Sequence, residues 1–236
     1  MIKYHTEFYN KCNDNEQWLR LGEGCLNNCE YCYAMPELIS YDIPKIKRNK
    51  VKIIDMNFLY NPKHKERIKY LGSQKVNNKK VYYELVCGID WRLLDQETAN
   101  LLKQNGFINI RFAWDYGLDC QYRIKDCYNK LIKAGYKPKD LMVFMLCDWR
   151  VSFSECLMKL SLLKIWNVKV SDCYFDNVKP PNYKCNYWSF LECDTFRRIC
   201  ALHNQSLDFY IYPDIKRVKR CIRSINKLKE QSILFK

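Results

Sequence analysis

Glycine, proline and long apolar stretches are all scarce in this chain. Only seven glycines and seven prolines occur in 236 residues, and the absence of a low-complexity run argues against disorder and long linkers. The longest purely apolar run, Leu141–Cys147, is far too short to cross a bilayer. Met1–Cys12 lacks the apolar core of a secretory signal peptide. We therefore expect a cytoplasmic location and no membrane partner.

Acidic residues are few compared with basic ones. The chain has 40 Lys and Arg against 26 Asp and Glu, which gives a formal net charge of +14. Such an excess attracts polyanions and makes nucleic acid a candidate partner. A solvated basic surface without a specific partner is the alternative explanation.

Cysteine, by contrast, is abundant, with fourteen residues. Without a secretory signal, a reducing compartment is expected, and most of these thiols should be buried as small apolar side chains. Three of them, Cys25, Cys29 and Cys32, lie within eight residues and have the spacing C-x3-C-x2-C. Cluster iron prefers thiolate ligands, and the spacing differs from ferredoxin patterns in which four cysteines saturate the cluster. Three ligands on a [4Fe–4S] cube would leave one iron open for a substrate or cofactor.

The cysteine motif, with Tyr31 directly before its last cysteine, resembles the CxxxCx(aromatic)C signature of the radical S-adenosylmethionine (radical SAM) superfamily. The resemblance implies that Cys25, Cys29 and Cys32 ligate a [4Fe–4S] cluster and that Tyr31 belongs to the cofactor site. In that family the open iron binds SAM, and reduction cleaves SAM to a 5′-deoxyadenosyl radical. The resemblance also implies a flavodoxin-like or ferredoxin-like reductant. A structural zinc site, which would need a fourth ligand, and three unrelated thiols are the alternatives.

Strand and helix patterns alternate along most of the chain. Six strand segments separated by five crossovers, most of them helical, predict a parallel α/β sheet. Six units are too few for a closed eight-stranded barrel, so the predicted fold is a partial (β/α)6 TIM-like barrel, as the resemblance also implies. The predicted strands are 17–21, 51–60 (ending in a turn), 81–89, 107–114, 141–147 and 168–175, and the main helices are 64–71, 95–104, 124–134 and 153–166.

The sequence predicts three regions. Residues 1–16 form an N-terminal extension or short helix, residues 17–176 the radical SAM core, and residues 177–236 a small aromatic and basic C-terminal extension. A short helix over 35–40 is expected after the cysteine loop. The C-terminal region is expected to contain a helix over 187–202, a strand over 207–212 and a helix over 215–228.

In parallel α/β folds, functional side chains gather at the C-terminal ends of the strands. After the second predicted strand, Asp55 and Asn57 are candidates to accept a hydrogen bond from the SAM amino group. The family usually has a GGE-like segment at this place, which this chain lacks. A strand-end turn stabilised by these side chains is the alternative.

Three further strand ends carry candidates for the cofactor site. Arg92, after the third strand, can hold the SAM carboxylate through two N–H groups, and Asp90 can accept from substrate or cofactor. An ion pair between these two residues is the alternative. Asp115, after the fourth strand, is a candidate acceptor for ribose hydroxyls, and Asp148, after the fifth, is a further acceptor. No residue is assigned a catalytic role.

The functional hypothesis is a radical SAM enzyme that modifies a macromolecule or its precursor. The basic charge favours RNA or a nucleotide-derived substrate. A radical SAM enzyme that modifies a peptide or protein, and a non-catalytic nucleic-acid-binding protein with an iron–sulfur or zinc centre, are the alternatives.

Overall fold

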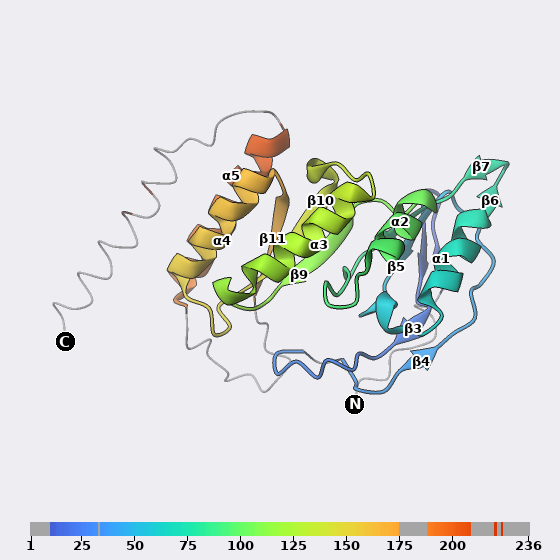
Figure 1. The fold of residues 1–236 in the computed structure, drawn as a ribbon, viewed down its shortest axis with the longest axis horizontal. Coiled ribbons are helices and arrows are strands. Elements are labelled where there is room, and N and C mark those ends of the chain that lie inside the picture. Colours follow the sequence, from blue (N-terminus) through green and yellow to red (C-terminus); the bar gives the residue numbers. More distant parts are fainter. Residues whose placement is uncertain (1–9, 33, 175–187, 209–219, 221–222, 224–236) are drawn as a thin grey trace. The chain divides into compact units, whose positions relative to one another are not determined.

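The structure is a computed structural model that describes residues 10–32, 34–174, 188–208, 220 and 223 (Figure 1). The chain divides into two compact units. The first contains residues 1–113 and 121–141, and the second contains residues 114–120 and 142–236. We describe each unit by itself.

The first unit is built on a sheet whose parallel strands follow one another in chain order. Strand β2 (Gln17–Leu19) pairs in parallel with β5 (Lys50–Ile53), and β5 pairs in parallel with β8 (Tyr82–Leu85). At the opposite edge, β1 (Asn10–Cys12) pairs with β2 in the antiparallel direction. The parallel strands place their C-terminal ends, and the loops that follow them, along one edge of the sheet.

Strand β9 (Ile110–Trp114) continues this parallel order. Isolated parallel bridges join Tyr83 to Phe107 and Ile89 to Phe112, so the segment around β9 runs beside β8. Tyr83 and Phe107 are fully buried and their rings stack with centroids 5.2 Å apart. This aromatic pair anchors the middle of the core of the first unit, where offset rings gain packing energy.

Three helices complete the first unit: α1 (His64–Ser73), α2 (Gln96–Gln104) and α3 (Gln121–Lys133). In Figure 1, α1 and α2 lie in front of the strands. The side chain of Asp95 accepts a hydrogen bond from the backbone N–H of Thr98 at 2.6 Å and thereby caps α2. This is the cap that the sequence predicts, because a free N–H at a helix start favours a carboxylate.

The second unit contains the parallel pair β10 (Leu141–Cys147) and β11 (Lys169–Tyr174), joined by the crossover helix α4 (Phe153–Trp166). A further helix, α5 (Phe190–Asp208), contacts β11 and α4. The side chain of Ser152 caps the start of α4. These elements give a strand–helix–strand unit of the kind that the alternating pattern predicts.

The described elements agree with most of the predicted order. Strand β10 and helix α4 have the predicted bounds, and the other core strands and helices begin and end within four residues of prediction, except in the segment 51–60. There, strand β5 already ends at Ile53, and the 3-10 helix Phe58–Tyr60 follows. The chain has a mixed α/β fold, and its described strands form no closed barrel. The partial (β/α)6 barrel and the division at residues 16 and 176 stay predictions.

Three local predictions differ from the structure. The segment 35–40 is irregular and ends in the short strand β4 (Ile39–Ser40) instead of a helix, because its strand pairing dominates its weak helix propensity. Asn10–Cys12 forms strand β1, where an extension or helix was expected. Leu207 and Asp208 continue α5, so the predicted strand over 207–212 is wrong at its start. Most of the predicted helix over 215–228 lies outside the described residues.

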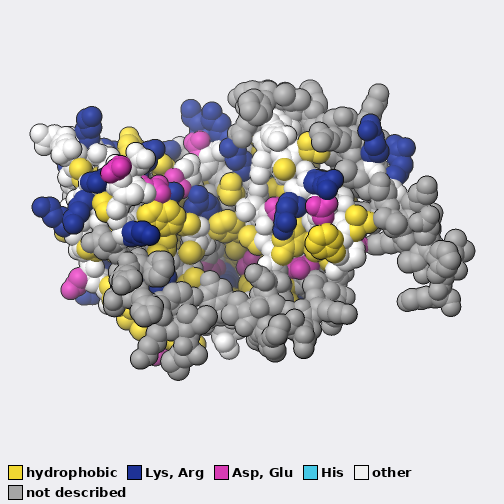
Figure 2. Space-filling model, turned by 180° about the vertical axis from the view of Figure 1, so that it is seen from behind, with side chains coloured by type: hydrophobic (Ala, Val, Ile, Leu, Met, Phe, Trp, Pro, Cys, Tyr) yellow, Lys and Arg dark blue, Asp and Glu magenta, His cyan; other side chains and the backbone are white. Residues whose placement is uncertain are grey.

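The surface reflects the basic composition. On the face shown in Figure 2, Lys and Arg side chains lie in several groups, with acidic and apolar side chains between them. No helix within the described ranges is both long and apolar enough to cross a membrane.

Candidate functional site

The cysteine loop follows β2 directly and is closed by a short pair of strands. Strand β3 (Gly22–Glu23) pairs with β4 in the antiparallel direction, with Gly22 opposite Ser40 and Glu23 opposite Ile39. The chain therefore leaves this strand pair after Glu23 and returns to it at Ile39, which closes the loop that carries the motif cysteines. Because β2 is parallel to β5, this loop lies at the C-terminal ends of the strands.

Arg67 of α1 holds the base of the loop. Its guanidinium donates to the carbonyl of Leu21 at 2.9 Å, to the hydroxyl of Ser40 at 2.8 Å and to the carbonyl of Tyr41 at 2.6 Å. One rigid group therefore bonds to both strands of the loop base. A planar guanidinium suits this task, because its donors are fixed relative to one another.

Asp55 binds the same base from the sheet. Its carboxylate accepts a hydrogen bond from the backbone N–H of Leu21 at 2.7 Å and is almost completely buried. Burial raises the pKa of Asp55 to about 7, although the backbone N–H groups of Leu21 and Gly22 and the charge of Arg67 act in the opposite direction. Asp55 thus contacts the chain segment that leads into the cysteine loop.

Gly24 makes the turn into the loop. Its φ is +86°, and a Cβ at this position would lie 1.7 Å from the carbonyl oxygen of Glu37. Any larger residue would therefore force the two sides of the loop apart, in addition to the strain of a positive φ. This geometry therefore requires glycine at position 24, directly before Cys25.

We expect Gly24→Ala to destabilise the closed loop by about 2 kcal/mol. Gly135→Ala is the matched control, because Gly135 also has a positive φ, of +97°, but its Cβ would meet nothing nearer than 3.9 Å. Limited proteolysis of the loop, together with urea unfolding, measures the difference. Equal behaviour of the two variants would show that the contact with Glu37 does not constrain the loop.

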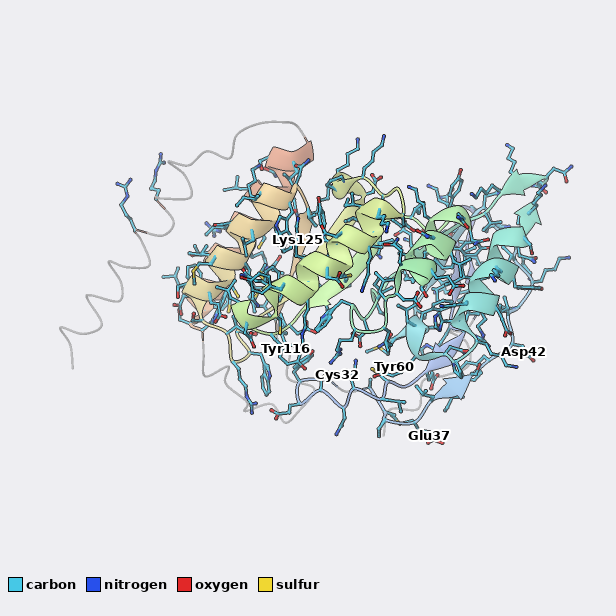
Figure 3. All side chains as sticks on the ribbon, viewed as in Figure 1. Cys32, Glu37, Asp42, Tyr60, Tyr116 and Lys125 are labelled. Carbon is cyan, nitrogen blue, oxygen red and sulfur yellow. The ribbon has the colours of Figure 1, made fainter. Side chains whose placement is uncertain are left out.

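The three motif cysteines are reduced and differ in exposure. Cys25 and Cys29 are half-buried and Cys32 is exposed. Figure 3 places Cys32 on the loop, with Tyr60 beside the same segment. The loop is ordered by backbone hydrogen bonds from Cys25 N to Met35 O at 2.8 Å and from Cys32 N to Cys29 O at 2.9 Å. Among the described residues, no group of three or more His, Cys, Asp or Glu side chains is arranged to hold a single metal ion.

Asp90 accepts hydrogen bonds from side chains of three segments. It follows β8, is buried, and accepts hydrogen bonds from Asn27 of the cysteine loop and from Asn57 after β5 at 3.4 Å. Arg92 forms an ion pair with it through Nε and Nη2 at 2.8 and 2.9 Å. Burial would raise the pKa of Asp90, but the bonds from Arg92 and Asn27 outweigh it and lower the pKa. Asp90 is therefore an anion at neutral pH.

Asn57 connects this cluster to the first motif cysteine. Its Nδ2 lies 3.6 Å from Sγ of Cys25, within the range of a hydrogen bond to sulfur. Its Oδ1 is buried and, among the described residues, has no hydrogen-bond partner. A buried acceptor without a donor costs free energy, so this atom indicates a place where a donor from a bound group fits.

Tyr60 completes the contacts of the loop. It ends the 3-10 helix Phe58–Tyr60, and its hydroxyl donates to Oδ1 of Asn27 at 2.6 Å. Burial and the nearby charge of Asp90 raise the pKa of Tyr60, so its hydroxyl stays protonated. Asn27 is thus held between a donor and an acceptor. We define Asn27, Asn57, Tyr60, Asp90 and Arg92 as the polar cluster.

The chain resembles a known enzyme in fold. The solved structure of the radical SAM methyltransferase TsrM from Kitasatospora setae, with cobalamin and a [4Fe–4S] cluster bound, matches it with a TM-score of 0.53 and 10% sequence identity. The match covers 66% of this chain and 36% of that enzyme. The likeness is one of fold. No protein-family model and no curated protein matches the sequence.

The fold brings together several of the residues that the sequence predicts for the site. Asn57, Asp90 and Arg92 meet beside Cys25 in the first unit. The ion pair between Asp90 and Arg92, which was the alternative to cofactor contacts, is present. Asp55 bonds to the loop base instead of joining the polar cluster. Cofactor roles for these four residues stay predictions.

The remaining candidates are Tyr31, Asp115 and Asp148. Tyr31 is half-buried on the cysteine loop. Asp115 and Asp148 belong to the second unit. Burial, together with the charge of Asp115, raises the pKa of the Cys173 thiol to about 11. Asp148 is buried and has a left-handed backbone, with φ of 58°. Roles in cofactor binding stay predictions for all three.

Sequence reasoning missed Asn27 and Tyr60. Asn27 lies between two motif cysteines, and its position inside the motif was a usable signal for a loop-fixing side chain. Tyr60 gave no such signal, because its contact with Asn27 joins residues 33 positions apart. Only the packing of the 3-10 helix against the loop brings them together.

Asp90→Ala should cost about 3 kcal/mol of unfolding free energy, because a buried anion is removed and its cationic and amide donors lose their acceptor. Asp126→Ala is the matched control. Asp126 pairs with Lys130 on the surface of α3 at 2.7 Å, and such pairs contribute about 0.5 kcal/mol. Urea unfolding of both variants checks the prediction. If Asp90→Ala lost no more unfolding free energy than the control, the polar cluster would not stabilise the fold as described.

Proposed function

We propose that the protein is a radical SAM enzyme in which Cys25, Cys29 and Cys32 bind a [4Fe–4S] cluster. One observation carries the proposal. A three-cysteine loop is closed at the C-terminal end of β2. Asn57, after β5, contacts its first cysteine, and Asp90, after β8, accepts hydrogen bonds from Asn57 and from Asn27 of the loop. The radical SAM-like fold supports it. When bound, such a cluster supplies the electron that cleaves SAM to methionine and a 5′-deoxyadenosyl radical.

The residues present fit this cofactor pair. Three thiols on one loop match a cluster with one open iron. The Oδ1 of Asn57, which has no hydrogen-bond partner among the described residues, fits a donor such as the amino group of SAM. Its Nδ2, beside Sγ of Cys25, can donate to the thiolate and stabilise the negative charge there. The side-chain amide of Asn57 would thereby contact both SAM and the cluster ligand Cys25.

The ion pair of Asp90 and Arg92 places a negative and a positive side chain next to each other in the site. Asp90 would stabilise the positive groups of SAM, and the guanidinium of Arg92 would bind its carboxylate. Asp55 and Arg67 would hold the loop in place during binding. Asp115, Asp148 and Tyr31 are proposed as further cofactor contacts. A flavodoxin-like or ferredoxin-like protein is the proposed reductant.

The proposed substrate is RNA or a nucleotide-derived molecule. The net charge of +14 supports this choice over an acidic peptide. A peptide or protein substrate is an alternative outcome of the same assay, because the modified molecule is identified by its mass.

Anaerobic reconstitution with iron and sulfide, followed by reduction with dithionite in the presence of SAM, tests the proposal. We expect 5′-deoxyadenosine and methionine in equal amounts, detected by chromatography and mass spectrometry, and neither product without reductant. A protein that takes up zinc alone, or iron without any cleavage of SAM, would contradict the proposal and favour a non-catalytic centre.

A further inference from the structure

A rigid hairpin projects from the first unit ahead of β8. Strands β6 (Lys75–Val76) and β7 (Lys79–Lys80) pair in the antiparallel direction across the two-residue turn Asn77-Asn78. Both turn residues have positive φ, 51° and 59°, as the tightest hairpin turns require. The side-chain amide of Asn49 donates to the carbonyls of Val76, Lys79 and Lys80 at 3.1 to 3.2 Å. The hairpin is therefore fixed to the sheet.

This hairpin concentrates positive charge. Lys75 lies directly opposite Lys80, an arrangement of like charges that destabilises a strand pair. Lys80 is partly compensated, because it donates to the carbonyl of Gln104 at the end of α2 at 3.3 Å. Lys69, Lys75 and Lys79 are exposed, and none of them forms an ion pair with another described residue. A bound anion would relieve this repulsion.

An exposed aromatic ring lies beside these lysines. Tyr82 at the start of β8 is 44% exposed. The ammonium of Lys80 lies 6.0 Å from the centre of the Tyr82 ring, and Lys50 is the strand neighbour of Tyr82. Exposed rings between cations are the arrangement on which unpaired bases stack while phosphates contact lysines.

We propose that the hairpin surface, defined as Lys75, Lys79, Lys80 and Tyr82, binds single-stranded nucleic acid. An acidic protein would be attracted by the lysines but would not need an exposed aromatic face beside them. The hairpin precedes β8, whereas the cysteine loop follows β2, so the two lie at opposite ends of the parallel strands (Figure 1). The ligand is therefore a polynucleotide that extends beyond the reacting site, not a mononucleotide. Binding at the hairpin surface would name the substrate class of the proposed enzyme, and only that identification of the bound strand as substrate rests on the proposed function.

Fluorescence anisotropy of the reconstituted full chain, without SAM or reductant, measures binding independently of SAM cleavage. The probes are fluorescein-labelled U20 and dT20, which distinguish RNA from DNA, and labelled polyglutamate, which represents an acidic protein. The test variants are Lys75→Ala/Lys79→Ala and Tyr82→Ala. The matched control is Lys133→Ala/Lys137→Ala, which removes the same charge from exposed positions of the same unit. Circular dichroism checks that all variants are folded.

We expect U20 or dT20 to bind more tightly than polyglutamate. Lys75→Ala/Lys79→Ala should reduce the slope of log K against log salt by about 1.4, because each lost phosphate contact contributes about 0.7 for a single strand. Tyr82→Ala should weaken binding roughly tenfold or more. The control should change affinity less than about twofold, since it lies outside the hairpin surface.

Three results would overturn the proposal: no oligonucleotide binding at low salt, equal effects of the hairpin and control double variants, or polyglutamate binding as tight as that of the oligonucleotides. None of these results would affect the SAM cleavage assay. Failure of the hairpin surface and failure of the radical SAM function are thus distinguishable.

Discussion

Replacing Cys29 by serine is expected to abolish cluster binding and with it the formation of 5′-deoxyadenosine. A serine hydroxyl is a poor substitute for thiolate on cluster iron, and two remaining cysteines cannot hold the cube in place. Cys25→Ser and Cys32→Ser should have the same effect. Iron and sulfide content, the visible absorption of the reconstituted protein and product analysis measure the loss.

The control for these variants is Cys12→Ser. Cys12 is exposed on β1, outside the cysteine loop, and its loss should leave iron content and SAM cleavage unchanged. Circular dichroism should show that all four variants retain the fold, because none of these cysteines belongs to the buried core. Cluster content that falls equally in Cys12→Ser, or persists in Cys29→Ser, would mean that the motif has been assigned to the wrong ligands.

Asp55→Asn is expected to change how stability depends on pH. The folded-state pKa of Asp55 is about 7, raised by burial from 3.8, so the folded protein holds a proton that the unfolded chain releases. Stability from this group is fully present below the unfolded pKa and is lost as pH rises from about 4 to about 7. A shift of about three units corresponds to roughly 4 kcal/mol.

Asparagine keeps an oxygen for the N–H of Leu21 but never becomes charged. Between pH 5.5 and pH 8, the native chain should therefore lose roughly 2 kcal/mol of unfolding free energy relative to Asp55→Asn, at about 1.4 kcal/mol for each pKa unit. Urea unfolding at the two pH values measures this change. Asp140→Asn, at a position that is only half-buried, is the matched Asp-to-Asn control. A parallel pH dependence of the native chain and Asp55→Asn would refute the buried, protonated carboxyl.

Much of the fold could be predicted from the sequence because local signals agree with the tertiary structure. Asp95 caps α2 as predicted, and the apolar run Leu141–Cys147 forms β10 with its predicted bounds. Leu207 shows the limit of such signals. It was expected to begin a strand, but packing keeps it within α5, where it is buried.

The candidate site was predictable only in part. The cysteine spacing and the rule that functional groups follow parallel strands were sufficient to select Asn57, Asp90 and Arg92. The sequence did not indicate that Asp55 would bond to Leu21, since that contact spans 34 positions. The lack of a partner for the Asn57 oxygen among the described residues was likewise not predictable, because it depends on where every neighbouring side chain lies.

Mössbauer spectroscopy of the 57Fe-reconstituted protein, with and without SAM, tests the central claim most directly. Three thiolates on a [4Fe–4S] cube leave one iron distinct from the others, and SAM should bind there. We predict that one quarter of the iron signal shifts when SAM is added and that the rest does not. Four equivalent irons whose signals do not change when SAM is added, or a protein that binds no cluster, would contradict the account.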